Sequence, residues 1–335
     1  MKLQDNKLIL TNGKNPFTEE QDKEEWFITN LPYEKIVLSG KGYVSTEALS
    51  LLNQNSRSVI LVDSFGNLVS FMNGMMNSFN GTKNIIAQCN TFRKPDKCLY
   101  LQRQTVKAKI QSQIDFLKST QNDLVKDDIS KLESYLRQTD YSDPIKVEVP
   151  SSHVYFANYT KLIPARHHFE SRNNSRQTIT KIDASDPINA LLNYGYAVLA
   201  GEISKFVCGD DLDPYYGFYH KKHASFPSLV YDLMEPFRWL VDYSVYVLAN
   251  FRISKSIRKK DCAYTKDGLV VLDSNLIKRF LELLERKFQR ERRYEYKFGA
   301  FTSDGLKWVQ EITITKIAVQ NLANFCIGKN KVFQV

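Results

Sequence analysis

The sequence predicts an α+β protein in which a β-rich, β-sandwich-like domain over residues 1–92 precedes a larger all-helical domain over residues 93–335. Short runs of β-branched and aromatic residues recur through the first part of the chain, as is typical of strands. From about Arg93 onward, apolar residues recur instead at helical spacing. The length of 335 residues also exceeds one typical core and favours two domains.

The N-terminal domain is expected to contain strands over residues 26–29, 35–38, 58–62 and 68–71. A hairpin-like turn is predicted between the last two strands, over residues 63–67, where Asp, Ser, Gly and Asn gather. A short helix over residues 44–52 is expected between strands, because Ser45 or Thr46 can cap its first turn.

The second domain is predicted to be built from helices. A long apolar helix is expected over residues 186–200, because Asp186 is a good N-cap and Pro187 suits the first turn. Apolar residues at helical spacing predict further helices over residues 104–117, 127–136, 239–248, 275–293 and 308–322.

The charge balance points to a polyanionic partner. The formal net charge is +9, and residues 252–297 alone carry fourteen Lys and Arg against seven Asp and Glu. Such an excess most often indicates nucleic acid, and less often an anionic membrane surface. The alternative is a pair of charged helices that face only solvent.

Cysteine usage and hydropathy predict a soluble, cytoplasmic protein with no membrane partner. The five cysteines are scattered, odd in number and form no C-x-x-C pair, so neither a disulfide framework nor a zinc knuckle is expected. The first residues lack the apolar core of a signal peptide. No apolar run approaches the roughly 20 residues that a spanning helix requires.

One short span holds a set of candidate metal ligands. His220 precedes Asp232 by twelve residues, and Glu235 follows three residues later. Carboxylates at i and i+3 share a helix face, so Asp232 and Glu235 can point at the same ion. One imidazole with hard oxygen ligands suits Mg²⁺ or Mn²⁺ at a phosphoryl-transfer centre. The alternative is that the two carboxylates form a capping pair at a helix start, with His220 in a loop.

Several phrases of the chain occur together, in this order, in a known family. They are Asp-Pro-Ile-Asn-Ala-Leu-Leu-Asn-Tyr-Gly-Tyr at 186–196, Leu-Asp-Pro at 212–214, Gly-Phe-Tyr-His at 217–220 and Ser-Leu-Val-Tyr-Asp-Leu-Met-Glu-Pro-Phe-Arg at 228–238. Residues 36–49 and 62–66 also look like the N-terminal β-domain of that family. The chain thus resembles, over most of its length, the CRISPR-associated integrases of spacer acquisition, the Cas-one family.

The resemblance implies a catalytic metal site in the helical domain. Family members bind a divalent ion, Mg²⁺ or Mn²⁺, through a Glu, a His and an acidic residue. The His matches His220, the acidic residue matches Glu235 with Asp232 as its neighbour near the metal, and the first Glu matches Glu148, seven residues before Tyr-Phe. Val-Pro replaces the usual glycine and small residues after Glu148, so Glu202 is the alternative ligand. His223 and the pair at 167–168 are expected to be loop residues.

The implied activity is that of a metal-dependent DNA endonuclease and integrase. It joins a DNA 3′-hydroxyl to a phosphodiester by transesterification and inserts foreign fragments, as spacers, into the CRISPR array. His220 must be neutral to bind the ion, so activity is expected to fall in mild acid. The side chains expected to contact DNA phosphates are Arg238, Arg252, Arg258, Lys259 and Lys260, the last three as a clamp beside the site.

The resemblance also implies an assembly. The N-terminal domain is expected to form a two-fold homodimer, and two such dimers are expected to flank a dimer of the small second CRISPR-associated protein, Cas-two. DNA partners are the foreign fragment and the CRISPR repeat. Two other readings of the site stay open: a metal-dependent nuclease that cuts branched DNA without integrating it, and a non-catalytic nucleic-acid-binding scaffold.

Overall fold

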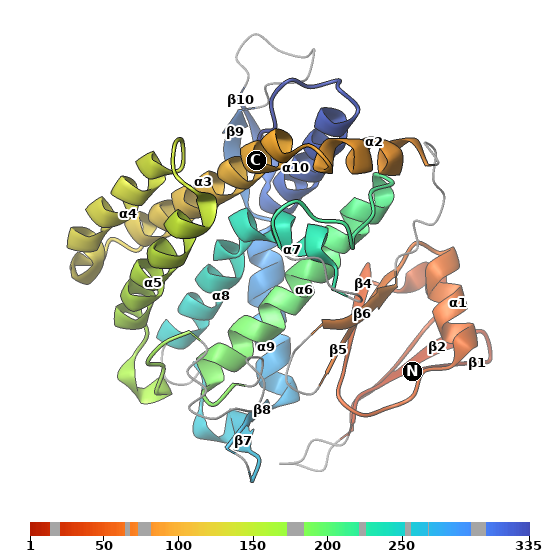
Figure 1. Cartoon of the computed structure of the whole chain (residues 1–335). Helices are drawn as coiled ribbons and strands as arrows, with labels where there is room; N and C mark the ends of the chain where they lie inside the picture. The colour runs from red at the N-terminus through yellow and green to blue at the C-terminus, as the bar shows by residue number, and fades with distance from the viewer. Residues whose placement is uncertain are drawn as a thin grey trace.

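The structure of the chain is a computed structural model. The residues that it describes are 1–13, 21–63, 68–72, 82–172, 184–220, 226–251, 256–266, 268–295 and 306–335. Strands of the N-terminal part lie to one side of a larger helical body (Figure 1). The predicted α+β class, with a β-rich part before a helical part, is therefore confirmed.

Two three-stranded sheets make up the N-terminal part. The strands are β1 (Lys2–Gln4), β2 (Lys7–Thr11), β3 (Lys23–Trp26), β4 (Lys35–Ser39), β5 (Ser58–Val62) and β6 (Leu68–Met72). In the first sheet, β2 pairs antiparallel with both β1 and β3. In the second sheet, β5 lies between β4, which is parallel to it, and β6, which is antiparallel. The parallel pair requires a crossover, which helix α1 (Thr46–Gln54) provides.

Helix α1 begins where the sequence predicts. Ser45 is its N-cap, and its hydroxyl accepts the Ala48 N–H at 3.2 Å. The helix buries Ala48 and Leu52 together with Leu8 of β2 and Val59 of β5. The two sheets and α1 thus share one small apolar core.

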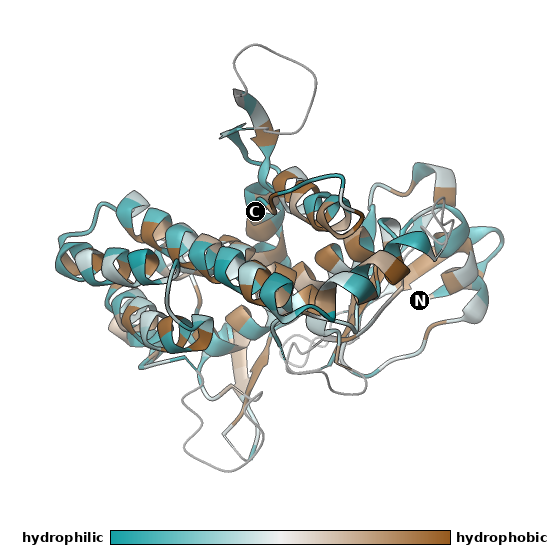
Figure 2. Ribbon diagram, turned by 45° about the horizontal axis from the view of Figure 1, so that its top comes forward, coloured by the Kyte–Doolittle hydropathy of each residue, from teal (hydrophilic) through white to brown (hydrophobic). Residues whose placement is uncertain are grey.

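The helical body is formed by α2 (Lys83–Phe92), α3 (Pro95–Ser119), α4 (Lys126–Gln138), α5 (Pro144–Leu162), α6 (Pro187–Gly209), α7 (Ser228–Met234), α8 (Trp239–Asn250), α9 (Ser274–Phe288) and α10 (Glu311–Cys326). Short 3₁₀ turns are η1 (Ile28–Asn30), η2 (Asp123–Val125), η3 (Ala165–His167), η4 (Glu235–Phe237) and η5 (Lys259–Asp261). Buried apolar residues of these helices form the main core. The ribbon shows hydrophobic and hydrophilic residues alternating along the helices (Figure 2). No helix of the described residues is long and apolar enough to cross a membrane.

Helix α6 is the centre of the fold. Asp186 caps it by accepting the Asn189 N–H at 2.8 Å, and Pro187 opens its first turn, as predicted. Gly201 of α6 lies against the second sheet, where an added Cβ would be 2.6 Å from Cδ1 of Ile60 in β5. Ile60 also belongs to the main apolar core of the helical body. The N-terminal sheet therefore packs directly onto the helix that runs through the protein.

The expectation of an all-helical second domain is wrong in two places. Two hairpins interrupt the helices, β7 (Cys262–Tyr264) with β8 (Val270–Leu272), and β9 (Glu291–Glu295) with β10 (Leu306–Gln310). The predicted helix over 275–293 ends as α9 at Phe288, and the predicted helix over 308–322 begins only at Glu311. The strand expected over 26–29 is also too late, because β3 ends at Trp26 and η1 follows.

Candidate active site

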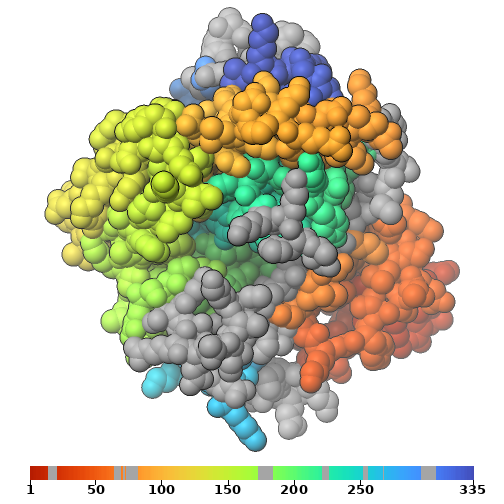
Figure 3. Space-filling view, in the orientation of Figure 1, coloured from red at the N-terminus to blue at the C-terminus, as the bar shows by residue number. Residues whose placement is uncertain are grey.

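The predicted metal ligands come together from separate elements. Glu148 lies in α5, Glu235 begins η4 directly after α7, and His220 lies in the segment between α6 and α7. Helices α3, α5 and α7 with η4 pack against one another and so bring these positions close. The described residues that follow α6, up to residue 220 and in green, lie between α3, in orange, and α5, in yellow-green (Figure 3).

A lysine joins the two glutamates. The Lys109 ammonium, from α3, forms ion pairs with Oε1 of Glu148 and, at 2.6 Å, with Oε2 of Glu235. The Tyr219 hydroxyl donates a hydrogen bond to Oε2 of Glu148. Burial alone would lower the pKa of Lys109, but the charges of Glu235 and Glu148 raise it. The lysine is therefore a buried cation between two carboxylates.

His220 is oriented by Asp232. Its Nδ1 lies 2.6 Å from Oδ1 of Asp232, and its Nε2 lies 3.9 Å from Oε1 of Glu235. Burial tends to lower the His220 pKa, but the hydrogen bond and charge of Asp232 raise it above the usual value. The imidazole thus presents Nε2 toward Glu235.

Asp232 also holds the backbone that carries His220. Its carboxylate accepts the N–H groups of Phe218, Tyr219 and His220 at 2.7, 2.9 and 2.8 Å, and the residue is fully buried. An added Cβ at Gly217 would lie 2.5 Å from Oδ2 of Asp232, so this segment needs a glycine there. Because Asp232 lies within α7 and not at its start, it does not act as the helix cap of the alternative reading.

Glu235 is a buried carboxylate that its neighbours hold in the ionised form. Burial would raise its pKa, but the charges of Arg238, Lys109 and His220 lower it to about 2. Arg238 donates from Nε to Oε1 of Glu235 at 2.8 Å, and its guanidinium lies 4.6 Å from the centre of the Tyr196 ring. Arg238, predicted only as a DNA contact, is thus part of the site and keeps 24% of its side chain exposed.

A buried carboxylate lies behind Arg238. Asp242 of α8 accepts the hydroxyls of Tyr155 at 2.7 Å and Tyr196 at 2.5 Å. Burial raises its pKa to about 6, against the lowering effect of those hydroxyls and of Arg238 and Arg172. This group links α5, α6 and α8 behind the site.

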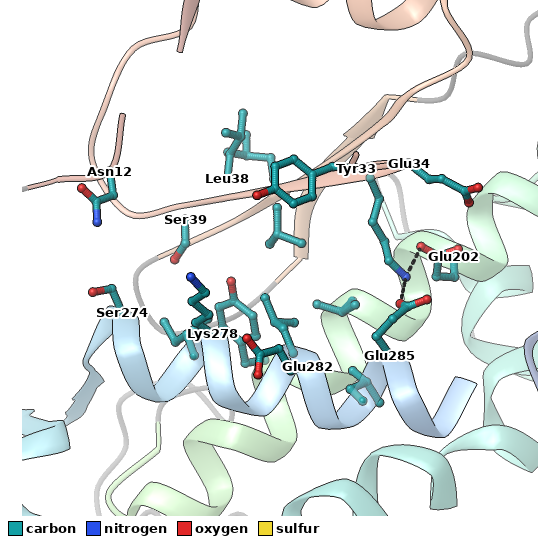
Figure 4. A pocket seen from close by; sticks show the side chains of 18 of the residues that line it. Asn12, Tyr33, Glu34, Leu38, Ser39, Glu202, Ser274, Lys278, Glu282 and Glu285 are labelled. Carbon is teal, nitrogen blue, oxygen red and sulfur yellow. Dashed lines mark ion pairs between the residues drawn. The ribbon is translucent and has the colours of Figure 1, made fainter. Parts of the chain in front are cut away.

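Glu202, the alternative ligand, has another role. It pairs with Lys35 of β4 at 3.1 Å, and Lys35 also pairs with Glu285 of α9 at 2.7 Å (Figure 4). These groups line a hollow of about 1440 Å³ between β4, α6 and α9. None of Glu148, His220 and Glu235 lines that hollow. Glu202 therefore joins the sheet to the helices, while α5 continues through Pro150 and keeps Glu148 in the site.

The predicted phosphate clamp, Arg258 with Lys259 and Lys260, lies near the C-terminal end of α8. Arg258 pairs with buried Asp261 at 2.9 Å, while Lys259 and Lys260 are exposed. Asp261 and its neighbour Ser256 lie near Ala249, at the C-terminal end of α8, whereas Glu235 precedes the start of that helix. The clamp is therefore not beside the carboxylates, since the twelve residues of α8 alone span roughly 18 Å. Arg252 and His223 lie outside the described residues.

The other predicted loop histidines are also remote from the carboxylates. His167 is buried, and its Nε2 lies 3.2 Å from the Ala249 carbonyl oxygen at the end of α8. His168 follows η3 with a left-handed backbone. Both lie beyond the C-terminal end of α5, more than three turns past Glu148.

The sequence reasoning missed Lys109 and Tyr219. Lys109 carries a signal, because it falls beside Val106 and Ile110 on the buried face of a helix, where a charge needs a partner. Tyr219 stands directly before His220 but offers no sign of its distant partner Glu148.

The donor set fits a divalent ion. The carboxylates of Glu148 and Glu235 share the Lys109 ammonium, and Nε2 of His220 lies 3.9 Å from Oε1 of Glu235, so two hard oxygen ligands and one imidazole nitrogen are available within one small region. Among the described residues, however, no group of three or more His, Cys, Asp or Glu side chains is already arranged around one point as ligands. The Lys109 ammonium stands between the two glutamates instead.

Known proteins resemble this chain over most of its length. The chain matches the family described as CRISPR associated protein Cas1 over residues 1–286. It is 28% identical over 302 residues to a CRISPR-associated endonuclease Cas1 of Thermodesulfovibrio yellowstonii, covering 85% of this chain and 89% of that protein.

Solved structures share the fold. A casposase bound to its integration product matches with a TM-score of 0.83 at 23% identity, over 99% of this chain and 89% of that one. A Cas6-RT-Cas1–Cas2 complex matches with a TM-score of 0.73 at 19% identity, over 100% of this chain and 36% of that one.

Proposed function

This chain belongs to the Cas1 family of CRISPR-associated proteins, and from that premise we propose that it is a divalent-metal-dependent DNA endonuclease and integrase of CRISPR adaptation. Its substrates are foreign DNA fragments, which it inserts into the CRISPR repeat. The observation that carries the proposal is the meeting of Glu148, His220 and Glu235 beside the exposed part of Arg238.

Glu148, His220 and Glu235 would hold Mg²⁺ or Mn²⁺. A bound ion of this kind supplies charge for the transferring phosphate and lowers the pKa of a bound hydroxyl. Asp232 keeps the Nδ1 side of His220 engaged, so Nε2 is left for the ion. Arg238 presents its charge at the mouth of the site, where it can neutralise a non-bridging phosphate oxygen.

In the proposed reaction, the 3′-hydroxyl of the incoming fragment attacks a phosphorus atom of the repeat. A new P–O bond forms, the hydroxyl proton leaves, and the old P–O bond breaks to release a 3′-hydroxyl of the repeat. The bonds made and broken are alike, so no nucleotide cofactor is required. The buried carboxylates therefore act by positioning and charge.

The proposed partners are DNA, a second copy of the chain and the small Cas2 protein. The net charge of +9 favours DNA. One chain of a Cas6-RT-Cas1–Cas2 complex contains a part with the same fold as this chain, which supports the proposed Cas2 partner. Joining both ends of a fragment requires two sites at a fixed separation, which a two-fold dimer provides. The proposed setting is the cytoplasm, where the array DNA is accessible.

Hydrolysis of branched DNA is the second candidate, because water can replace the 3′-hydroxyl at the same site. Strand joining into a supercoiled plasmid with a repeat separates the two activities. We expect joined product in Mg²⁺ or Mn²⁺, none in chelator, and none from Glu148→Gln or His220→Ala. Glu282→Gln, an exposed glutamate of α9, is the matched control. Cleavage of branched DNA without joining, with and without Cas2, would favour the nuclease.

A metal titration by calorimetry tests the scaffold alternative. The proposal expects Mn²⁺ binding that Glu148→Gln and Glu235→Gln weaken while DNA affinity persists. A chain that binds DNA but neither binds Mn²⁺ nor breaks a phosphodiester would be a scaffold, and the proposed function would be wrong.

A further inference from the structure

The ammonium of Lys109 is a buried charge beside the candidate metal ligands. The lysine is only 8% exposed, yet it carries a full charge between Glu148 of α5 and Glu235 of η4. Among the described side chains, it is the cation that contacts both glutamates. It occupies the space between the carboxylates at which a divalent ion would have to be bound.

The helix leaves the lysine little freedom to be elsewhere. Lys109 projects from the buried face of α3, which also carries Val106 and Ile110, and that face packs on α5 and η4. A neighbouring lysine of the same helix, Lys107, points instead to the surface and pairs with Asp140. The burial of Lys109 is therefore specific to its position.

We propose that Lys109 is an internal counter-cation, which holds the two glutamates in the metal-free protein and must leave them when a divalent ion binds. The proposal rests on the proposed function, because it takes Glu148 and Glu235 as ligands of that ion.

The charges explain why the lysine is needed. Glu235 is buried and Glu148 is half-buried, so without a cation the two carboxylates would repel each other after losing much of their hydration. The ammonium removes that cost and keeps the carboxylates ionised and close together. It also repels an incoming divalent ion and occupies ligand oxygens, so it lowers the affinity for metal.

Exchange of the two cations has a consequence for substrate. A displaced ammonium and a divalent ion together leave an excess of positive charge in the site. A DNA phosphate supplies the missing negative charge, so metal and DNA are expected to favour each other's binding. Metal alone is then bound weakly, which limits chemistry in the absence of DNA.

The test measures metal binding directly. Mn²⁺ is titrated calorimetrically into the full chain as wild type, Lys109→Gln, Lys109→Met and the matched surface control Lys107→Gln. Melting temperatures are recorded in chelator and in Mn²⁺. We expect Lys109→Gln to bind Mn²⁺ about tenfold more tightly than wild type, within the usual range of such couplings. In chelator it should melt lower, and Mn²⁺ should raise its melting temperature more than that of wild type.

A second measurement needs no variant. Acetylation of wild-type lysines, read by mass spectrometry, should leave Lys109 unreactive in chelator and make it reactive in Mn²⁺, while Lys107 changes little. The counter-cation proposal is wrong if wild type and both Lys109 variants bind Mn²⁺ with equal affinity. It is also wrong if Mn²⁺ does not alter the reactivity of Lys109. Neither result contradicts the proposed metal-dependent function. If neither wild type nor any Lys109 variant binds Mn²⁺, the proposed metal-dependent function fails with it.

Discussion

Nδ1 of His220 lies 2.6 Å from Oδ1 of Asp232, and the same carboxylate accepts the backbone N–H of His220. One buried side chain therefore sets both the position of the histidine and the direction of its free nitrogen. Asp232 acts on the reaction through His220 and through the loop before it.

Replacing Asp232 should therefore damage the fold locally as well as the activity. We expect Asp232→Ala to lose most joining activity and roughly 2–4 kcal/mol of stability, because three backbone N–H groups lose their acceptor. Asp232→Asn should lose less stability but still weaken Mn²⁺ binding. Urea unfolding and calorimetry measure the two effects. Wild-type stability and Mn²⁺ affinity in Asp232→Ala would contradict this role.

The pH dependence of metal binding should reflect His220. Its pKa is raised in the metal-free protein, so the proton that competes with metal is held at higher pH than for a free histidine. Folding stability depends on pH in the opposite direction to metal affinity. Protonated His220 stabilises the metal-free fold at low pH, and this contribution is lost as the pH rises through the raised pKa of the folded state. Mn²⁺ affinity should therefore fall as pH drops from 8 to 6, measured by calorimetry at each pH. His220→Ala should bind Mn²⁺ weakly at every pH and lose that slope.

The stability of the folded protein should depend on pH through Asp242, which is not one of the proposed metal ligands. Its pKa is raised to about 6, so its contribution to stability is present below the unfolded pKa and is lost as pH rises through about 6. Asp242→Asn cannot ionise, and we expect the difference in unfolding free energy between pH 5 and pH 7.5 to shrink by about 1–3 kcal/mol. Urea unfolding of both proteins at the two pH values measures it. An unchanged difference would mean that Asp242 ionises in the fold as it does in the unfolded chain.

The two ion pairs of Lys35, which join β4 to α6 and α9, should stabilise the fold to different extents, the more buried pair contributing more. Lys35→Met removes the shared cation and leaves Glu202, whose side chain is 9% exposed, without its partner, so we expect a loss of roughly 1–3 kcal/mol. Glu285→Gln, at a side chain that is 41% exposed, should cost less than about 1 kcal/mol. Urea unfolding gives both values. The opposite order would show that Glu202 is solvated.

Among the basic residues near the end of α8, Arg258 should stabilise the fold, whereas Lys259 and Lys260 should bind DNA. Arg258→Gln removes one of the two arginine partners of buried Asp261, leaving Arg279, and is expected to lower stability. Lys259→Gln with Lys260→Gln should leave stability unchanged and reduce the salt slope of DNA affinity by roughly 0.9 for each phosphate that these lysines neutralise. A double variant of exposed Lys329 and Lys331 is the control. Fluorescence anisotropy at several salt concentrations measures the slope, and a wild-type slope would remove this surface from the DNA interface.

Local signals predicted much of the fold because they act over a few residues. Ser45 and Asp186 start helices by accepting an N–H of the first turn, and Pro187 does so through its fixed backbone angle. The β-branched run at 58–62 is a strand over the same residues. The break after Phe288 was not predictable from periodicity, because β9 exists only through its pairing with β10. Helical spacing continues through a segment that long-range pairing turns into a strand.

The candidate site divides in the same way. Glu148, His220 and Glu235 were predicted from phrases that the chain shares with a family, and their role as ligands stays a prediction. Lys109 is 39 positions from Glu148, and only the packing of α3 on α5 brings the two together. Charge and spacing in the sequence identify a buried lysine but do not name its partner.

The contact between Gly201 and Ile60 bears on how separate active sites keep their distance. Because residue 201 has no side chain, the Ile60 side chain of β5 packs directly on the backbone of α6, which fixes the sheet against this helix. If the proposed dimer is joined through the sheets, side-chain packing and not a linker would therefore fix the distance between its two sites. In the proposed dimer, a bulkier residue at 201 would push β5 away from α6 and so alter the separation of the two sites.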